Sequence, residues 1–162
     1  MAGMDPELFR NSPLSEGFDS DESLMLADFF QQKDMSAGMT VFLENMPGES
    51  LYLIQQGQVE ISKMLAEGDE QSLVKLGPGE LFGELAILDS HPRSATARVI
   101  EDVVLLVITQ FEYERLRNIN AEIALKLTLN IIRQFSERVR ENNEEYRRML
   151  LLAMGKENPP PG

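Results

Sequence analysis

A glycine-bracketed turn and the arginine that follows it are the residues of this chain best suited to chemistry, within residues 79–98. The run after Gly83 has helix-forming composition, so a short helix is expected to begin at Gly83 or Glu84. The first N–H groups of such a helix, on Leu85 and Ala86, have no partners inside it and lie at the positive end of its dipole. The sequence therefore predicts a small anion-binding site.

Arg93 lies nine positions after Glu84 and supplies the positive charge that an anion requires. Pro92 stiffens the turn before it, and the small residues Ser94 and Ala95 would let a ligand approach closely. A planar guanidinium, a hydroxyl and two free amides suit a phosphate with two unesterified oxygens. Because the carboxylate of Glu84 would repel a phosphate, it is expected to face away and to accept hydrogen bonds from a sugar hydroxyl.

These residues resemble the phosphate-binding cassette of the cyclic nucleotide-binding domain family, of the catabolite activator protein and protein kinase A regulatory subunit type. Two runs carry the resemblance, Phe82-Gly83-Glu84-Leu85-Ala86 and Pro92-Arg93-Ser94-Ala95-Thr96, and it extends over about residues 22–148. In that family the first run holds the ribose and the cyclic phosphate, and the second neutralises the phosphate. The resemblance implies ligand contacts from Phe82, Gly83, Glu84, Leu85, Ala86, Arg93, Ser94 and Ala95.

Each residue of the cassette also has a simpler structural explanation. Gly79 and Gly83 could be ordinary turn glycines. Glu84 and Arg93 could form a surface ion pair, and Ser94 could be a strand residue. Specific residue types at fixed offsets together favour the functional interpretation, while a domain of the same shape that binds no nucleotide stays open.

Composition indicates a globular domain and argues against several classes of function. The 162 residues are 43% hydrophobic and 26% charged, which suffices for one domain with extensions. The absence of cysteine excludes disulfides and thiolate metal sites and fits a cytoplasmic location. A net charge of −12 argues against non-specific binding to nucleic acid or anionic membranes, so an anionic ligand needs a local pocket. Neither a membrane span nor a secretion signal is indicated.

The expected fold class is mainly β with flanking helices. Residues 1–21 are expected to be an unstructured lead, in part a cloning remnant, and an amphipathic helix should follow to Gln32. Turns rich in Gly and Pro then separate short alternating strands at residues 39–43, 51–55, 59–64, 72–76, 95–100 and 103–108. About eight such antiparallel strands predict a β-roll, or jelly roll, with a cavity between its sheets.

A β-roll cavity also occurs in cupin-type enzymes, which bind a metal through histidines. His91 is the single histidine of the chain and lies in a predicted loop. No second histidine and no cysteine could complete a metal site, and a Ser-His pair for hydrolysis would depend on this one residue. The sequence therefore predicts a protein that is not an enzyme and uses no metal or cofactor.

Two helices are expected to close the domain, at residues 110–116 and 121–153. The second would be about 48 Å long at 1.5 Å per residue. Its apolar residues alternate spacings of three and four, which favours a parallel homodimer with Asn142 as a polar register position. Packing of this seam on the β-roll is the alternative, and a second row at Ile123, Leu127 and Ile131 could rest there. The partner-facing residues would include Leu125, Ile132, Phe135, Val139 and Tyr146.

In the resembled family this helix also covers the bound base. Candidate covering residues are Gln134 and Arg138, whose guanidinium could stack on a purine or could simply be solvated. Leu73 and Val74, on the strand before the turn, could line the base or pack in the core. The domain would cover residues 22–153, followed by a disordered tail over residues 154–162.

The expected function is that of a cyclic nucleotide receptor, for cyclic AMP or alternatively cyclic GMP, in which the ligand biases the position of the long helix. Transcription regulators of the family continue into a helix-turn-helix, whereas this sequence ends soon after the helix, so DNA binding is not expected. A dimeric β-roll scaffold that binds no nucleotide is the competing hypothesis.

Overall fold

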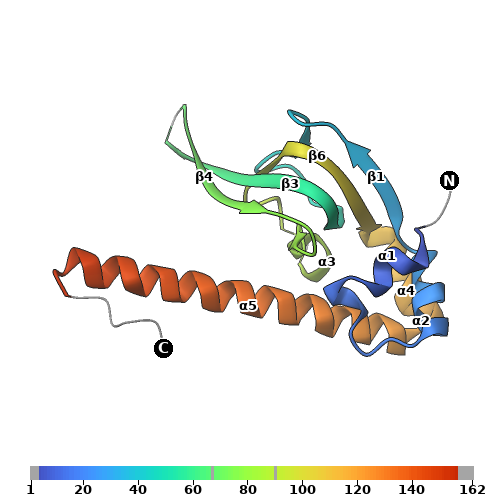
Figure 1. Cartoon of the computed structure of the whole chain (residues 1–162). Coiled ribbons are helices and arrows are strands. Elements are labelled where there is room, and N and C mark those ends of the chain that lie inside the picture. Colours follow the sequence, from blue (N-terminus) through green and yellow to red (C-terminus); the bar gives the residue numbers. More distant parts are fainter. Residues whose placement is uncertain (1–3, 67, 90, 157–162) are drawn as a thin grey trace.

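Two long strands organise the sheet of this protein, whose computed structural model describes residues 4–66, 68–89 and 91–156. β3 (Ser50–Ala66) and β6 (Thr96–Thr109) pair antiparallel, from Ser50 opposite Thr109 to Ser62 opposite Thr96. The other strands pair antiparallel with one of these two, β1 (Gln31–Met35) and β2 (Thr40–Phe42) with β6, and β4 (Asp69–Leu76) and β5 (Leu81–Phe82) with β3. Figure 1 shows the curved sheet above the long helix α5 (Ala121–Ala153).

The strands are fewer and longer than the sequence predicted. Residues 51–55 and 59–64 both lie within β3, and residues 95–100 and 103–108 both lie almost entirely within β6. The expected turn at Gly57 is a bulge inside β3, where the register against β6 shifts. Gly57 has φ +83°, and a Cβ there would lie 2.0 Å from the carbonyl oxygen of Asp102, so only glycine fits this close approach.

The core has two parts that together position the sheet and helices. Inside the roll, side chains from β3, β4, β5 and β6 pack together, among them Ile54, Val59, Leu76, Phe82, Val99 and Leu105. A second cluster joins the sheet to the helices through Leu53, Leu106 and Ile108. The predicted apolar row of α5, Ile123, Leu127 and Ile131, is buried in this second cluster. The antiparallel sheet with flanking helices and a long C-terminal helix agrees with the predicted fold class.

The prediction of an unstructured lead over residues 1–21 is wrong for residues 4–21, and residues 1–3 lie outside the described part. The segment forms α1 (Pro6–Arg10), a 3₁₀ turn η1 (Pro13–Ser15) and the start of α2 (Ser20–Ala27). Phe9 and Leu14 are fully buried in the helix-side core, which orders a stretch that is otherwise polar. α2 begins with a capping box between Asp19 and Glu22 and ends at Ala27, earlier than expected.

β1 also replaces part of the expected helix after residue 22. Its sequence, Gln-Gln-Lys-Asp-Met, has no apolar alternation, and four of its five side chains are exposed. It is an edge strand whose pairing with β6 supplies its stability, from Gln31 opposite Val107 to Met35 opposite Val103. Local propensity could not have predicted this strand because the stabilising partner lies about seventy residues away.

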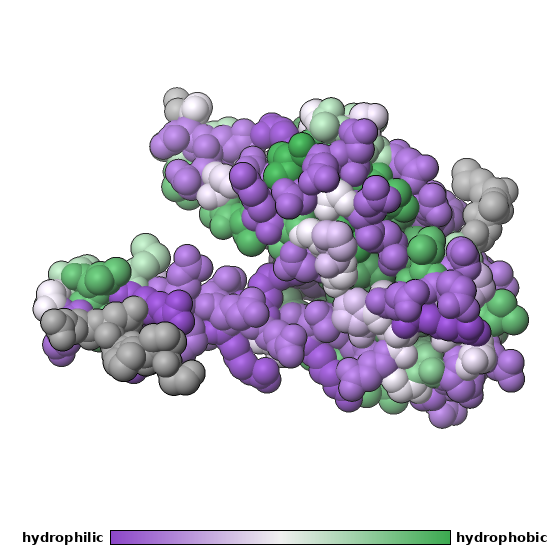
Figure 2. Space-filling model, in the orientation of Figure 1, coloured by the Kyte–Doolittle hydropathy of each residue, from purple (hydrophilic) through white to green (hydrophobic). Residues whose placement is uncertain are grey.

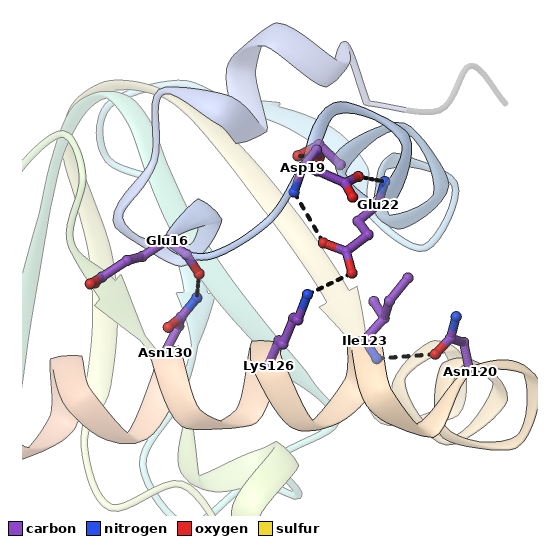
Figure 3. Close-up of polar contacts among 8 residues, drawn as sticks. Glu16, Asp19, Glu22, Asn120, Ile123, Lys126 and Asn130 are labelled. Atoms are coloured by element: carbon purple, nitrogen blue, oxygen red, sulfur yellow. Dashed lines mark hydrogen bonds and ion pairs between the residues drawn. The ribbon is translucent and has the colours of Figure 1, made fainter.

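The first half of α5 is held to the N-terminal segment by buried and partly buried polar contacts (Figure 3). Asn130 is 2% exposed, and its Nδ2 donates to the carbonyl oxygens of Leu14 and Glu16, each at 2.8 Å. Lys126 on the same helix lies 2.6 Å from the carboxylate of Glu22. A preceding helix, α4 (Gln110–Ile119), is three residues longer than expected, and Asn120 caps α5 by accepting from the N–H of Ile123.

The long helix has the predicted bounds, while most of the predicted tail, at residues 157–162, lies outside the described part. None of the helices in the described residues is both long enough and apolar enough to cross a membrane.

Candidate ligand-binding site

A cavity of about 370 Å³ lies between the roll and α5, lined by β3, β4, the β5–α3 turn, the segment 91–95 and one face of α5. Eleven candidate residues from the sequence border it: Phe82, Gly83, Glu84, Leu85, Ala86, Arg93, Ser94, Ala95, Leu73, Val74 and Arg138. Gln134 does not. The structure thus brings the predicted residues together around one space, and their contact with a ligand stays a prediction.

Arg93 is the central charged group of the cavity and is only 7% exposed. Its Nη1 donates to the carbonyl oxygen of Gly83 at 3.1 Å, and its Nη2 to that of Ser50 at 2.8 Å. Its Nε is buried without a hydrogen-bond partner among the described residues. Burial lowers the pKa of the guanidinium below its ordinary value, with Tyr52 and Glu84 opposing the shift. The group stays charged, so a cation is held largely out of water.

The guanidinium of Arg93 packs against a cluster of aromatic rings. Its central carbon lies 4.0 Å from the ring centroid of Phe42 and 5.7 Å from that of Tyr52. Tyr52 and Phe82 stack with centroids 5.0 Å apart, and Phe42 lies against both. The three rings come from β2, β3 and β5, so the strand pairing itself fixes where Arg93 can lie.

Gly83 allows the turn to pass directly beside this arginine. Its φ of +73° is in the left-handed region, and a Cβ would lie 2.6 Å from Nη1 of Arg93 and 3.0 Å from the carbonyl oxygen of Ser50. A side chain would therefore be strained and would also push the guanidinium from its place. Gly83 is thus more than the ordinary turn glycine of the simpler interpretation.

Glu84 faces the cavity and pairs with the long helix. Its Oε1 lies 3.7 Å from Nη1 of Arg138, and its Oε2 is buried without a hydrogen-bond partner among the described residues. The simpler interpretation of a surface ion pair with Arg93 is wrong, because the carboxylate is largely buried and its ion-pair partner is Arg138. Burying a carboxylate oxygen without a hydrogen-bond donor costs free energy. This position is therefore suited to accept a hydrogen bond from a hydroxyl of a ligand.

The short helix differs from the prediction. α3 (Leu85–Leu88) begins one residue after the expected start at Gly83 or Glu84, and the N–H of Ala86 donates to the carbonyl oxygen of Gly83 at 3.2 Å. The expectation of two free amides is therefore wrong for Ala86. A helix of four residues also has a weak dipole, so the positive charge at the cavity comes mainly from side chains such as Arg93.

Arg138, Leu73 and Val74 are placed differently from their simpler interpretations. Arg138 is half-buried, donates through Nη2 to the carbonyl oxygen of Leu81 and pairs with Glu84, so it is not merely a solvated surface residue. Leu73 and Val74 are 54% and 42% exposed and line the cavity, so they are not core residues. They leave an apolar wall open to a flat ligand group opposite α5.

Sequence reasoning missed several polar residues that also border the cavity, among them Lys63, Glu141 and Asn142. Lys63 is two residues from Ile61 on β3, and alternation along a strand could have placed both on the inner face. Asn142 was interpreted only as a register position, although it follows Arg138 by one helical turn. Among the described residues, no group of three or more His, Cys, Asp or Glu is placed to hold a metal ion.

Comparisons with known proteins all indicate the same family. A family model for the cyclic nucleotide-binding domain matches residues 32–120. The sequence is 36% identical over 104 residues to the Cyclic AMP receptor protein of Thermus thermophilus, covering 64% of this chain and 48% of that protein. It is 33% identical over 103 residues to the cAMP-dependent protein kinase regulatory subunit of Mycosarcoma maydis, covering 62% and 19%. The chain thus spans at most about half the length of these curated relatives.

A solved structure extends the similarity to three dimensions. The crystal structure of the Thermus thermophilus Catabolite Activator Protein matches with a TM-score of 0.73 and 31% sequence identity, over 86% of this chain and 64% of that chain. The match spans well beyond the segment that the family model covers.

Gly83→Ala is expected to destabilise the protein more than Gly79→Ala. Both glycines have positive φ, at +73° and +85°, so both substitutions should cost about 1 kcal/mol of backbone strain. A Cβ at Gly79 would meet nothing within 4 Å, whereas one at Gly83 would collide with Arg93, which should cost roughly 1–3 kcal/mol more. Urea unfolding of the two variants measures the difference, and equal losses would contradict the tight packing of Arg93 on Gly83.

Proposed function

The chain belongs to the cyclic nucleotide-binding domain family, and we propose that it is a receptor module for a cyclic nucleotide, with cyclic AMP as the expected ligand. The observation that carries the proposal is the desolvated guanidinium of Arg93, which borders a cavity large enough for a small molecule. Removing a cation from water costs free energy, and an anion in the cavity would offset that cost. A cyclic phosphodiester carries one negative charge and suits this position.

The two buried polar atoms without partners complement the two ends of such a ligand. Nε of Arg93 is a donor, and Oε2 of Glu84 can only accept. A ribose cyclic phosphate presents phosphate oxygens for the donor and a 2′-hydroxyl for the acceptor. The apolar wall at Leu73 and Val74 would then receive the base.

Glu84 also supplies a route from the ligand to the long helix. Its carboxylate pairs with Arg138 on α5 and is the expected partner of the ribose hydroxyl. A ligand that binds Glu84 changes the environment of the Arg138 contact, and through it the free energy of the present position of α5. The ligand can shift the helix only by its difference in affinity for the two arrangements. The proposed role is thus regulatory binding without a chemical conversion.

A thermal shift experiment separates this proposal from the scaffold that binds no nucleotide. Millimolar cyclic AMP or cyclic GMP should raise the melting temperature, because a ligand that binds only the native state stabilises it by RT ln(1 + [L]/Kd). The same concentration of adenosine, which lacks the phosphate, is the control. No shift with either cyclic nucleotide would favour the scaffold.

Arg93→Ala should weaken cyclic nucleotide binding by about 30- to several-thousand-fold, because it would leave a buried phosphate without its cation. Arg115→Ala is the matched control, since Arg115 also stacks on an aromatic ring, 4.3 Å from the centroid of Phe29, but does not border the cavity. Calorimetry measures both affinities, with ligand-free melting to verify that each variant folds. A loss below threefold for Arg93→Ala would contradict its role.

Glu84→Gln tests the hydroxyl contact. The variant should bind cyclic AMP more weakly than the wild type, while 2′-deoxy cyclic AMP, which lacks the hydroxyl, should lose much less affinity. Removing a charge-assisted hydrogen bond to a buried carboxylate should cost the ribose ligand roughly tenfold or more. Equal losses for both nucleotides in a fluorescence competition assay would remove the hydroxyl contact from the proposal.

We further propose that the module is a homodimer through α5 and lies in the cytoplasm, a location that its cysteine-free sequence supports. Leu125, Ile132, Val139 and Tyr146 are exposed on the single chain, while Phe135 is half-buried. Figure 2 shows hydrophobic residues gathered at the far end of α5, where Met149, Leu150, Leu152 and Met154 are exposed. An apolar seam of this length is suited to a second copy of the same helix.

Light scattering tests the dimer. The wild type should show twice the monomer mass of 18.3 kDa, and Val139→Glu should shift it towards monomer, because the symmetric interface would bring two carboxylates together. Leu24→Glu, at an exposed position on α2, should leave the mass unchanged. A wild-type monomer at about 100 µM, far above the dissociation constant of a stable dimer, would sink this part of the proposal.

A further inference from the structure

Lys63 borders the cavity beside the segment that carries Arg93. Its Nζ donates to the carbonyl oxygen of Ser94 at 3.1 Å and lies 3.8 Å from Oε1 of Glu44. The other carboxylate oxygen of Glu44 accepts from the N–H of Met64 at 3.0 Å. The ammonium is therefore anchored next to the residue that follows Arg93, and it has a third N–H beyond these two contacts.

Arg93 has only part of its hydrogen-bonding capacity left for a ligand. One N–H of Nη1 and one of Nη2 already donate to the carbonyl oxygens of Gly83 and Ser50, and the ring of Phe42 lies against the guanidinium. A cyclic phosphodiester spreads its charge over two exocyclic oxygens that point in different directions. A single guanidinium restrained in this way would hold one oxygen better than the other.

The third cation at the cavity, Arg138, already has other partners. Among the described lining residues the lysines and arginines are Lys63, Arg93 and Arg138, and Arg138 pairs with Glu84 and the carbonyl oxygen of Leu81. Three carboxylates border the same space, at Glu80, Glu84 and Glu141. These carboxylates repel an anion at short range, so a second positive charge near it would offset part of that repulsion.

We propose that Lys63 is a second cationic contact for the phosphate of the ligand, on the exocyclic oxygen that Arg93 does not hold. The proposal rests on the proposed function and assigns a residue outside the predicted cassette to the same ligand. The contacts of Lys63 with Ser94 and Glu44 hold its ammonium at the side of the cavity where Arg93 would bind the phosphate. A lysine can also donate to an acceptor on a purine base, and the experiment distinguishes this second role.

The test compares the affinities of Lys63→Met, Lys63→Arg and Lys75→Met by calorimetry with cyclic AMP and with cyclic GMP. Methionine keeps the length of the side chain and removes the charge. Lys63→Met should bind both nucleotides about tenfold more weakly, as for the loss of a partly exposed charge-assisted hydrogen bond. Lys63→Arg should stay within about threefold of the wild type. Lys75 lies on the neighbouring strand β4, is exposed and does not border the cavity, so Lys75→Met should bind normally.

Phosphorothioate diastereomers of cyclic AMP, in which sulfur replaces one exocyclic oxygen or the other, identify the atom. The wild type should prefer one diastereomer, and Lys63→Met should change that preference, because only one oxygen loses its partner. Unchanged affinity in Lys63→Met would overturn the proposal, as would a loss confined to cyclic GMP, which would assign Lys63 to the base. If the wild type binds neither nucleotide, the proposed function itself fails and this proposal fails with it.

Discussion

The site depends on the burial of the guanidinium of Arg93, which costs free energy because a charged group is removed from water. At 7% exposure, the group requires carbonyl oxygens for its N–H donors and an aromatic surface for its face. Ser50 and Gly83 supply the carbonyls, and Phe42 supplies the face. These contacts come from β2, β3 and the β5–α3 turn, so the pairing of distant strands is what makes the burial of one charge possible. Arg93 borders the cavity, and its Nε has no hydrogen-bond partner among the described residues.

The long helix has two regions with different attachments. Its first half, as far as Ile131, buries one face in the core cluster between the sheet and the helices and is held by Asn130 and Lys126 to the N-terminal segment. Its second half contacts the roll through Arg138, whose partners are Glu84 in the β5–α3 turn and Leu81 in β5. A change at the cavity would therefore act on the second half while the first half holds the helix in place. This division is the physical argument for the coupling that we propose between a ligand and the helix.

The sequence predicted the cassette, the bounds of the long helix and the type of fold because each has a local signal. Glycines at fixed offsets from Arg93 and an uninterrupted run from Ala121 to Ala153 can be recognised without knowing any tertiary contact. β1 and α1 could not be predicted in this way. β1 is polar and depends on β6, and α1 is ordered by the burial of Phe9. The Glu84–Arg138 pair was missed for the same reason, since the two residues lie 54 positions apart in the sequence.

The charge of the whole chain and the charge of Arg93 act in opposite directions on an anion. Solvent-exposed carboxylates produce most of the net −12, and their effect is screened within about 8 Å at physiological salt. The buried guanidinium of Arg93 is screened much less, because little water or salt reaches it. An anion near the surface is therefore repelled only weakly, while an anion inside the cavity meets the less screened field of Arg93 at short range. Binding strength must come from short-range contacts in the cavity, which is why individual side chains there matter more than the total charge.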